Sequence, residues 1–161
     1  MKKIGLLLLG IALLSMPAFA QFAFEEDFDY TAGDLLGSHG WLMTSTPSDV
    51  NPFTVVAPSL TFTGYGPSGI GNACAILTTG QDRYKEFNTT ITSGDVYLWA
   101  MINVSAAQAA GDYFLAMSPT TQTNMTSRIY IKSNGSGFVL GLTKSNETPV
   151  NYGSTVLSFN T

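Results

Sequence analysis

The chain has 161 residues, of which 45% are hydrophobic and only 11% are charged, and it contains a single cysteine. The large hydrophobic fraction excludes a disordered protein, and an acidic chain without clustered Lys and Arg excludes a nucleic-acid-binding protein. One cysteine allows no disulfide within the chain, so we expect core packing to provide the stability.

Residues 1–20 have the three-part pattern of a secretory signal peptide: two lysines, an apolar run at 4–14 and a small-residue exit that ends at Ala20. The run is shorter than the roughly 20 apolar residues that cross a bilayer. We therefore expect cleavage after Ala20, a secreted or cell-surface location and no membrane insertion of the mature protein. Gln21 then stands where a lipoprotein would have its lipid-modified cysteine, which argues against a lipid anchor.

After this leader, residues 21–161 have the composition of one all-β domain. Short segments rich in β-branched and aromatic residues alternate with clusters of Gly, Pro, Asn and Ser, a pattern typical of sandwiches and barrels. We predict a two-sheet antiparallel sandwich. The candidate strands are 22–30, 53–56, 60–63, 73–78, 84–90, 96–104, 113–117, 128–132, 138–142 and 155–159.

The first candidate strand, residues 22–30, has an aromatic face and a mostly acidic face. Glu26 interrupts the aromatic face, and an unpaired buried carboxylate is costly. A hydrogen-bonded partner, a local bulge or a bound Ca²⁺ would each accommodate it. Because Ca²⁺ takes carboxylate and carbonyl oxygens, Glu26 and Asp27 are the candidate ligands of a structural calcium ion.

The next segments contain a histidine, a tryptophan and a cysteine, but none of them stands in a catalytic or metal-binding motif. We interpret His39, in a loop with glycines at positions 37 and 40, as an ordinary loop histidine, and Trp41 as a core residue. Cys74 is expected to be a small buried hydrophobic residue. One histidine and one cysteine do not make the usual zinc site. Residues 105–110 are the one segment expected to form a helical turn.

Three aromatic residues are the candidate ligand contacts. Tyr97 and Trp99 share one face of the predicted strand 96–104, and Tyr130 lies on a later strand. Aromatic faces beside amides and hydroxyls bind sugars, since ring stacking supplies contact area and polar groups fix orientation. The alternative is that these side chains fill the layer between two sheets, as large inward residues do in sandwiches.

Near the C-terminal end, Asn134-Gly135 separates two alternating segments, 128–132 and 138–142. Asn-Gly is a strong short-range hairpin signal, because type I′ turns need positive φ at both central residues. The two segments are therefore predicted to pair as an antiparallel hairpin.

Several short motifs resemble those of secreted bacterial proteins with a concanavalin A-like lectin/glucanase jelly roll. They lie at residues 24–36, 40–41, 58–61, 64–65, 69–73 and 111–114. The resemblance implies a jelly-roll sandwich, further modules of the same polypeptide and, in many such proteins, a C-terminal sorting domain for type IX secretion. It also implies that this chain is an N-terminal fragment whose jelly roll is incomplete at its C-terminus.

Three functions follow as expectations. The first is a non-catalytic recognition or adhesion module that binds a glycan or another cell-surface polymer, with no cofactor except the candidate calcium. The second is a structural spacer without a ligand. The third is a glucanase whose catalytic strand is missing here: Glu25, Asp27 and Asp29 alternate as a carboxylate pair requires, but they lack the spacing of the family's catalytic motif and lie on the opening strand.

Overall fold

The computed structural model describes residues 22–44, 50–119, 121–145 and 147–161. The predicted signal peptide lies outside these residues. Among the described residues, no helix has the length and apolar character needed to cross a membrane.

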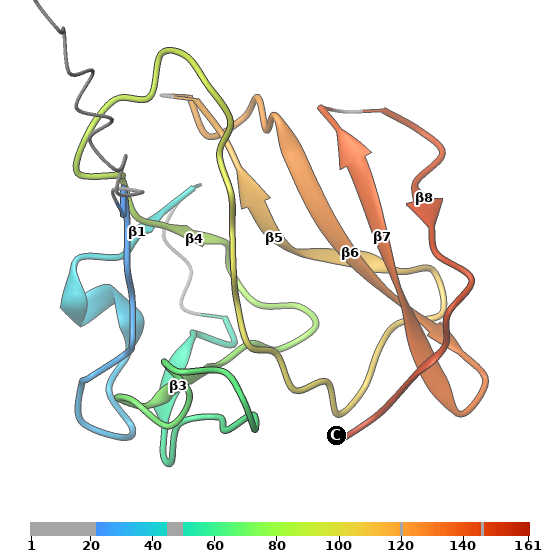
Figure 1. The fold of residues 1–161 in the computed structure, drawn as a ribbon, viewed down its shortest axis with the longest axis horizontal. Helices are drawn as coiled ribbons and strands as arrows, with labels where there is room; N and C mark the ends of the chain where they lie inside the picture. The colour runs from blue at the N-terminus through green and yellow to red at the C-terminus, as the bar shows by residue number, and fades with distance from the viewer. Residues whose placement is uncertain (1–21, 45–49, 120, 146) are drawn as a thin grey trace, which may run out of the picture.

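The N-terminal half forms two small antiparallel sheets. β1 (Leu42–Met43) pairs with β4 (Arg83–Tyr84), and β2 (Thr54–Val56) pairs with β3 (Ala73–Ala75). A single 3-10 turn, η1 (Leu36–His39), precedes β1 and ends at Gly40, whose φ of 80° suits glycine. Figure 1 shows these short strands on one side of the molecule.

The C-terminal half forms one five-stranded antiparallel sheet, on the other side of Figure 1. Its path is β5 (Asp112–Met117), β6 (Ser127–Asn134), β7 (Gly137–Lys144) and β8 (Asn151–Tyr152), and β9 (Leu157–Ser158) pairs with β7 as well. β6 and β7 are the two longest strands and pair over their full length, from Ser127↔Lys144 to Asn134↔Gly137.

The predicted hairpin is confirmed, with a two-residue loop. Asn134 pairs with Gly137, so the loop is Gly135-Ser136. Gly135 has φ 63°, whereas Ser136 is not among the residues with positive φ. Positive φ at the first central residue alone is the requirement of a type II′ turn, and glycine meets it. The turn therefore lies one residue later than the Asn-Gly signal indicates.

The all-β antiparallel class is confirmed, and seven of the candidate strands overlap an observed strand, although β3, β4 and β9 are much shorter than expected. The predicted strands at 22–30, 60–63 and 96–104 are wrong. Residues 105–110 form no helical turn, and the turn that does form, η1, was not expected.

The segment 94–103 explains one of these differences. It has the strand-like composition expected of it, but no backbone group in it is hydrogen-bonded to another described backbone group. The first such bond beyond it runs from the Asn160 N–H to the Val104 carbonyl, at 2.9 Å. A strand needs a neighbour as well as a suitable sequence, and this segment has none within the described chain.

The buried core is small and divided between the two halves. Leu36 and Val55 are buried in the N-terminal half, and Phe138 and Val139 are buried on β7. The ring of Phe159 stacks on Phe138 with centroids 5.6 Å apart, which joins the last residues to the sheet.

Candidate functional site

The register of the five-stranded sheet sorts its side chains onto two unlike faces. Side chains alternate along a strand, and residues directly opposite one another share a face. On β6, Arg128, Tyr130 and Lys132 therefore point to one side, and Ile129 and Ile131 to the other. We call these the tyrosine face and the apolar face.

Neighbouring strands extend both faces. The tyrosine face also carries Tyr113, Val139, Gly141, Thr143 and Tyr152. The apolar face also carries Leu115, Phe138, Leu140 and Leu142.

Three tyrosine rings form a continuous row across the tyrosine face. Tyr113 on β5 meets Tyr130 on β6 edge to face, with centroids 6.0 Å apart, and Tyr130 meets Tyr152 on β8 in the same way at 6.5 Å. Edge-to-face contact at these distances is favourable for aromatic rings. Tyr130, predicted as a ligand contact, is thus the middle ring of the row.

Two cations from β6 lie against the ends of this row. The Arg128 guanidinium lies 5.4 Å from the centroid of the Tyr113 ring, and its Nη1 donates to the Tyr130 hydroxyl at 3.4 Å. The Lys132 Nζ lies 5.2 Å from the centroid of the Tyr152 ring. Both distances are within the range of cation–π attraction.

A hydrogen bond from the Tyr113 hydroxyl to the Asp82 carboxylate ties the row to the N-terminal half, just before β4. Burial and this bond raise the pKa of Tyr113. Burial and the nearby Tyr130 and Asp112 raise the pKa of Tyr152. Both tyrosines are therefore neutral hydrogen-bonding groups at neutral pH.

Glycine is required where the Tyr152 ring rests on the sheet. A Cβ at Gly141, its cross-strand partner, would lie only 2.6 Å from Cδ1 of the ring, and a Cβ at Gly111 would overlap the Tyr152 hydroxyl. The ring covers bare backbone, an arrangement that glycine in a strand permits.

A shallow hollow of about 290 Å³ opens beside Tyr152. It is lined by Lys132, Ser133, Asn134, Val139, Tyr152 and Gly153. Its walls offer an ammonium, an amide, hydroxyls and an aromatic ring, the combination of apolar area and a few polar groups that ligand sites use. Its volume is slightly below the usual lower bound for small-molecule pockets, so it has room for one unit of a larger ligand.

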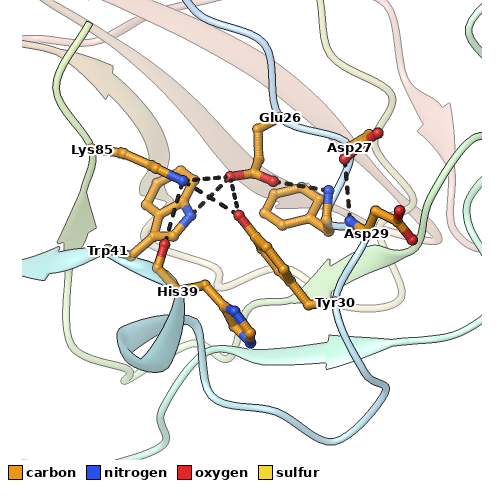
Figure 2. Close-up of polar contacts among 8 residues, drawn as sticks. Glu26, Asp27, Asp29, Tyr30, His39, Trp41 and Lys85 are labelled. Carbon is orange, nitrogen blue, oxygen red and sulfur yellow. Dashed lines mark hydrogen bonds and ion pairs between the residues drawn. The ribbon is translucent and has the colours of Figure 1, made fainter. Parts of the chain in front are cut away.

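Glu26 lies in a second polar cluster, shown in Figure 2. Its side chain is only 9% exposed. Oε2 accepts hydrogen bonds from Tyr30 Oη and Trp41 Nε1, both at 3.1 Å, and from Lys85 Nζ at 3.2 Å, while Oε1 accepts the Phe28 N–H at 3.0 Å. Hydrogen-bonded partners thus accommodate this carboxylate.

Lys85 is the charge partner in the cluster. Burial by itself lowers the pKa of the Lys85 ammonium, but its hydrogen bonds to Glu26 and Tyr30 outweigh this effect, and the pKa is raised. Lys85 also donates to the carbonyl of His39, at 3.4 Å. The cluster therefore fastens the N-terminal segment and η1 to the residue after β4, 59 positions away from Glu26.

Asp27, the other predicted calcium ligand, faces away from this cluster, as does Asp29 (Figure 2). Both are exposed, and Asp27 Oδ1 accepts the Asp29 N–H at 3.2 Å. Among the described residues there is no group of three or more His, Cys, Asp or Glu side chains that would hold a metal ion. The calcium site stays a prediction.

The segment 22–30 keeps the predicted alternation without forming a ladder. Phe24, Glu26, Phe28 and Tyr30 are half-buried, and the acidic residues between them are exposed. Phe28 has φ 51°, a left-handed conformation that breaks a regular strand. The face assignment is therefore right, whereas the strand is not.

Trp41 packs edge-on against Phe24 and stacks with Phe28, both near 6 Å, which fits the predicted core role. His39 stacks on Tyr30 with centroids 3.8 Å apart, and its Nε2 lies 2.9 Å from Asp34 Oδ2. This histidine is thus held by two specific contacts, which its glycine neighbours did not indicate.

Tyr97 and Trp99 lie elsewhere, on the unpaired segment 94–103. They are 71% and 67% exposed and stack on each other with centroids 5.9 Å apart. Neither makes a ring contact with Tyr130 among the described residues. The three predicted contacts are thus separated into an exposed pair and the middle of the tyrosine row.

The prediction from sequence missed Tyr152, Arg128 and Lys132. The two cations were detectable, because Arg-Ile-Tyr-Ile-Lys at residues 128–132 alternates polar and apolar residues and so places both on the face of Tyr130. Tyr152 was not detectable from sequence. It reaches this face only because β8 folds back after β7 and pairs Tyr152 with Gly141.

Comparisons with known proteins returned no matching family model, no matching curated protein and no matching solved structure.

Proposed function

We propose that this protein is an exported, non-catalytic recognition module that binds a glycan or a similar cell-surface polymer through its tyrosine face. The observation that carries the proposal is the row of Tyr113, Tyr130 and Tyr152 beside a hollow, on a sheet whose other face is apolar. Sugar rings present apolar C–H faces to aromatic rings and hydroxyls to polar groups, and both kinds of surface are present here.

The apolar face supports the finer assignment of fold. A sheet with one apolar face buries it against another layer. Leu142 on this face is 59% exposed within the described chain. We infer that the apolar face is the inner face of a two-sheet jelly roll of the concanavalin A-like kind. On the tyrosine face Val139 and Thr143 are buried, so the hollow beside Tyr152 is the part of that face open to a ligand.

The distribution of carboxylates supports binding without hydrolysis. Glycosidases use two carboxyl groups on either side of the scissile bond. Among the described residues near the tyrosine row, the Asp82 carboxylate accepts a hydrogen bond from the Tyr113 hydroxyl, and no carboxylate lines the hollow beside Tyr152. Asp112 accepts the Tyr113 N–H at 2.8 Å and lies on the other side of β5.

The leader supports export, and the weakly charged, Gly-, Ser-, Thr- and Asn-rich composition suits an extracellular β-protein. We include Tyr97 and Trp99 in the proposal as a second aromatic contact. Their exposure permits ring stacking with a polymer, although they are not part of the tyrosine row.

A glycan array and affinity electrophoresis with purified protein test the proposal. We expect binding to at least one polysaccharide, weakened about tenfold or more by Tyr130→Ala, because loss of a central ring removes stacking area and an anchor for both neighbours. Trp99→Ser and Tyr97→Ser, at exposed positions, are folding-neutral variants that measure the second contact.

Circular dichroism and thermal melting establish that each variant is folded. If Tyr130→Ala unfolds the protein, Tyr152→Phe replaces it, since that change removes only one hydroxyl. A folded protein that binds no glycan on the array and in the gels contradicts the proposal and favours a structural spacer.

A further inference from the structure

The charge distribution of the tyrosine face narrows the class of glycan. After residue 21 the chain has five basic residues against eleven acidic ones, yet Arg128 and Lys132 both lie on this face of β6. Two of these five basic residues thus contribute positive charge to one strand face of an otherwise acidic protein.

Lys132 is the cation available to a ligand. Its ammonium contacts the Tyr152 ring and forms no ion pair with a carboxylate among the described residues. Lysine is a strongly hydrated point charge with three donors on a flexible stem, which suits a ligand oxygen that approaches from solvent.

The two carboxylates nearest the row contact Tyr113 at its other end and do not line the hollow. Asp82 accepts the Tyr113 hydroxyl, and Asp112 accepts the Tyr113 N–H and a hydrogen bond from Gln108 Nε2. Neither lines the hollow, whose lining includes Lys132, Asn134 and Tyr152 but no carboxylate.

We propose that the hollow binds an acidic sugar, with the carboxylate of a uronic acid unit on Lys132 and the sugar ring against Tyr152. This inference rests on the proposed function and names the glycan class. The ammonium supplies a charge-assisted hydrogen bond, the ring supplies apolar area, and Asn134 supplies neutral donors and acceptors at the rim. The limited volume fits one such unit within a polymer that continues along the tyrosine row.

The test compares binding of polygalacturonate with binding of its fully methyl-esterified form, by affinity electrophoresis and calorimetry. The two polymers share the same sugar and differ in charge. We expect the acid form to bind about tenfold or more tightly, and the difference to shrink as salt is raised, because the ion pair is partly exposed.

Lys132→Gln should remove the preference for the acid form, while Lys144→Gln should keep it. Lys144 is the matched control, because it lies on the same hairpin but on the opposite face and is exposed. Neither residue lies in the core, and thermal melting verifies that both variants fold.

Two results overturn the inference in distinguishable ways. Equal binding of both polymers, or a preference that survives Lys132→Gln, removes the assignment of an acidic sugar but leaves glycan binding in place. No binding to either polymer, nor to any neutral glycan on the array, removes the proposed function together with the inference.

Discussion

The Glu26 cluster and the β6–β7 hairpin show two ways in which this chain becomes ordered. The hairpin is held by a continuous backbone ladder between residues close in sequence, from Asn134↔Gly137 outward. The region around Glu26 has almost no ladder and is held by side chains that meet across 59 positions. Local alternation and turn chemistry are therefore sufficient for the hairpin, whereas the N-terminal segment depends on a few distant partners.

The largest effect is expected where those partners converge. Glu26→Ala leaves the Tyr30 hydroxyl, Trp41 Nε1 and Lys85 ammonium without their shared acceptor, so it should lower the free energy of unfolding by about 3 kcal/mol. Urea denaturation measures the loss. Native-state hydrogen exchange should show it in residues 22–44 and not in β6–β7. An equal loss of protection in the hairpin would contradict the separation of the two regions.

A smaller loss of stability is expected from a substitution in the five-stranded sheet. Gly141→Ala places a methyl group against the Tyr152 ring, so β8 must move, at a cost of about 2 kcal/mol. The double variant with Tyr152→Ala should recover part of this loss, because the obstructing ring is then absent and only Val150 Cγ1, 2.8 Å from the same position, remains in the way. Additive losses in the double variant would mean that the ring does not lie over the glycine.

The glycine of the hairpin turn is expected to contribute about 1 kcal/mol to the free energy of unfolding. Gly135 has φ 63° and open space around the position of a Cβ, so Gly135→Ala pays a backbone penalty without a clash. The same change at Ser136 is the control and should have little effect. Thermal melting of the two variants gives the comparison, and a Gly135→Ala protein as stable as the parent would exclude the proposed turn.

The smallest effect concerns alkaline pH. Burial, with a contribution from Glu26, raises the pKa of the Cys74 thiol from 9.0 to about 11. A group whose pKa is raised in the folded state stabilises the fold at pH values below its pKa in the unfolded state. This stabilisation is lost as the pH rises toward the pKa in the folded state. Stability should therefore begin to fall near pH 9, by less than about 1 kcal/mol at pH 10, since the thiol is only half-buried.

Cys74→Ser should move the onset of this decline upward, toward pH 10, the ordinary pKa of tyrosine, because the raised pKa of Tyr113 in the folded state makes its stabilising effect decline only above that pH. Alkylation of Cys74 by iodoacetamide should have a midpoint near 11. A midpoint at the ordinary value of 9 would contradict the burial of the thiol.

The part of the fold that could be predicted from sequence is the part encoded locally. Strand-like composition at 113–117, 128–132 and 138–142 predicts three strands, and the Asn134-Gly135 signal predicts that the last two pair; all three strands form, and the hairpin is present. Segment 96–104 has an equally suitable sequence and forms none, because pairing is a property of two segments and no described segment lies beside it.

In the candidate site, too, the features that depend on local sequence were predictable and those that depend on distant partners were not. Tyr130 lies on a strand that was predicted correctly, and it is in the tyrosine row. Its separation from Tyr97 and Trp99 was not predictable, because it depends on which strands are neighbours. Glu26 was recognised as a residue that needs a partner, but nothing local identifies that partner as Lys85.

Whether the tyrosine face binds glycan is best tested by chemical-shift mapping of the labelled protein during titration with the tightest-binding polysaccharide from the array. We expect the largest shifts at Tyr130, Tyr152 and Lys132, with no change at Glu26 or Lys85. Saturable binding whose shifts instead centre on the Glu26 cluster, with the tyrosine row unaffected, would contradict this expectation.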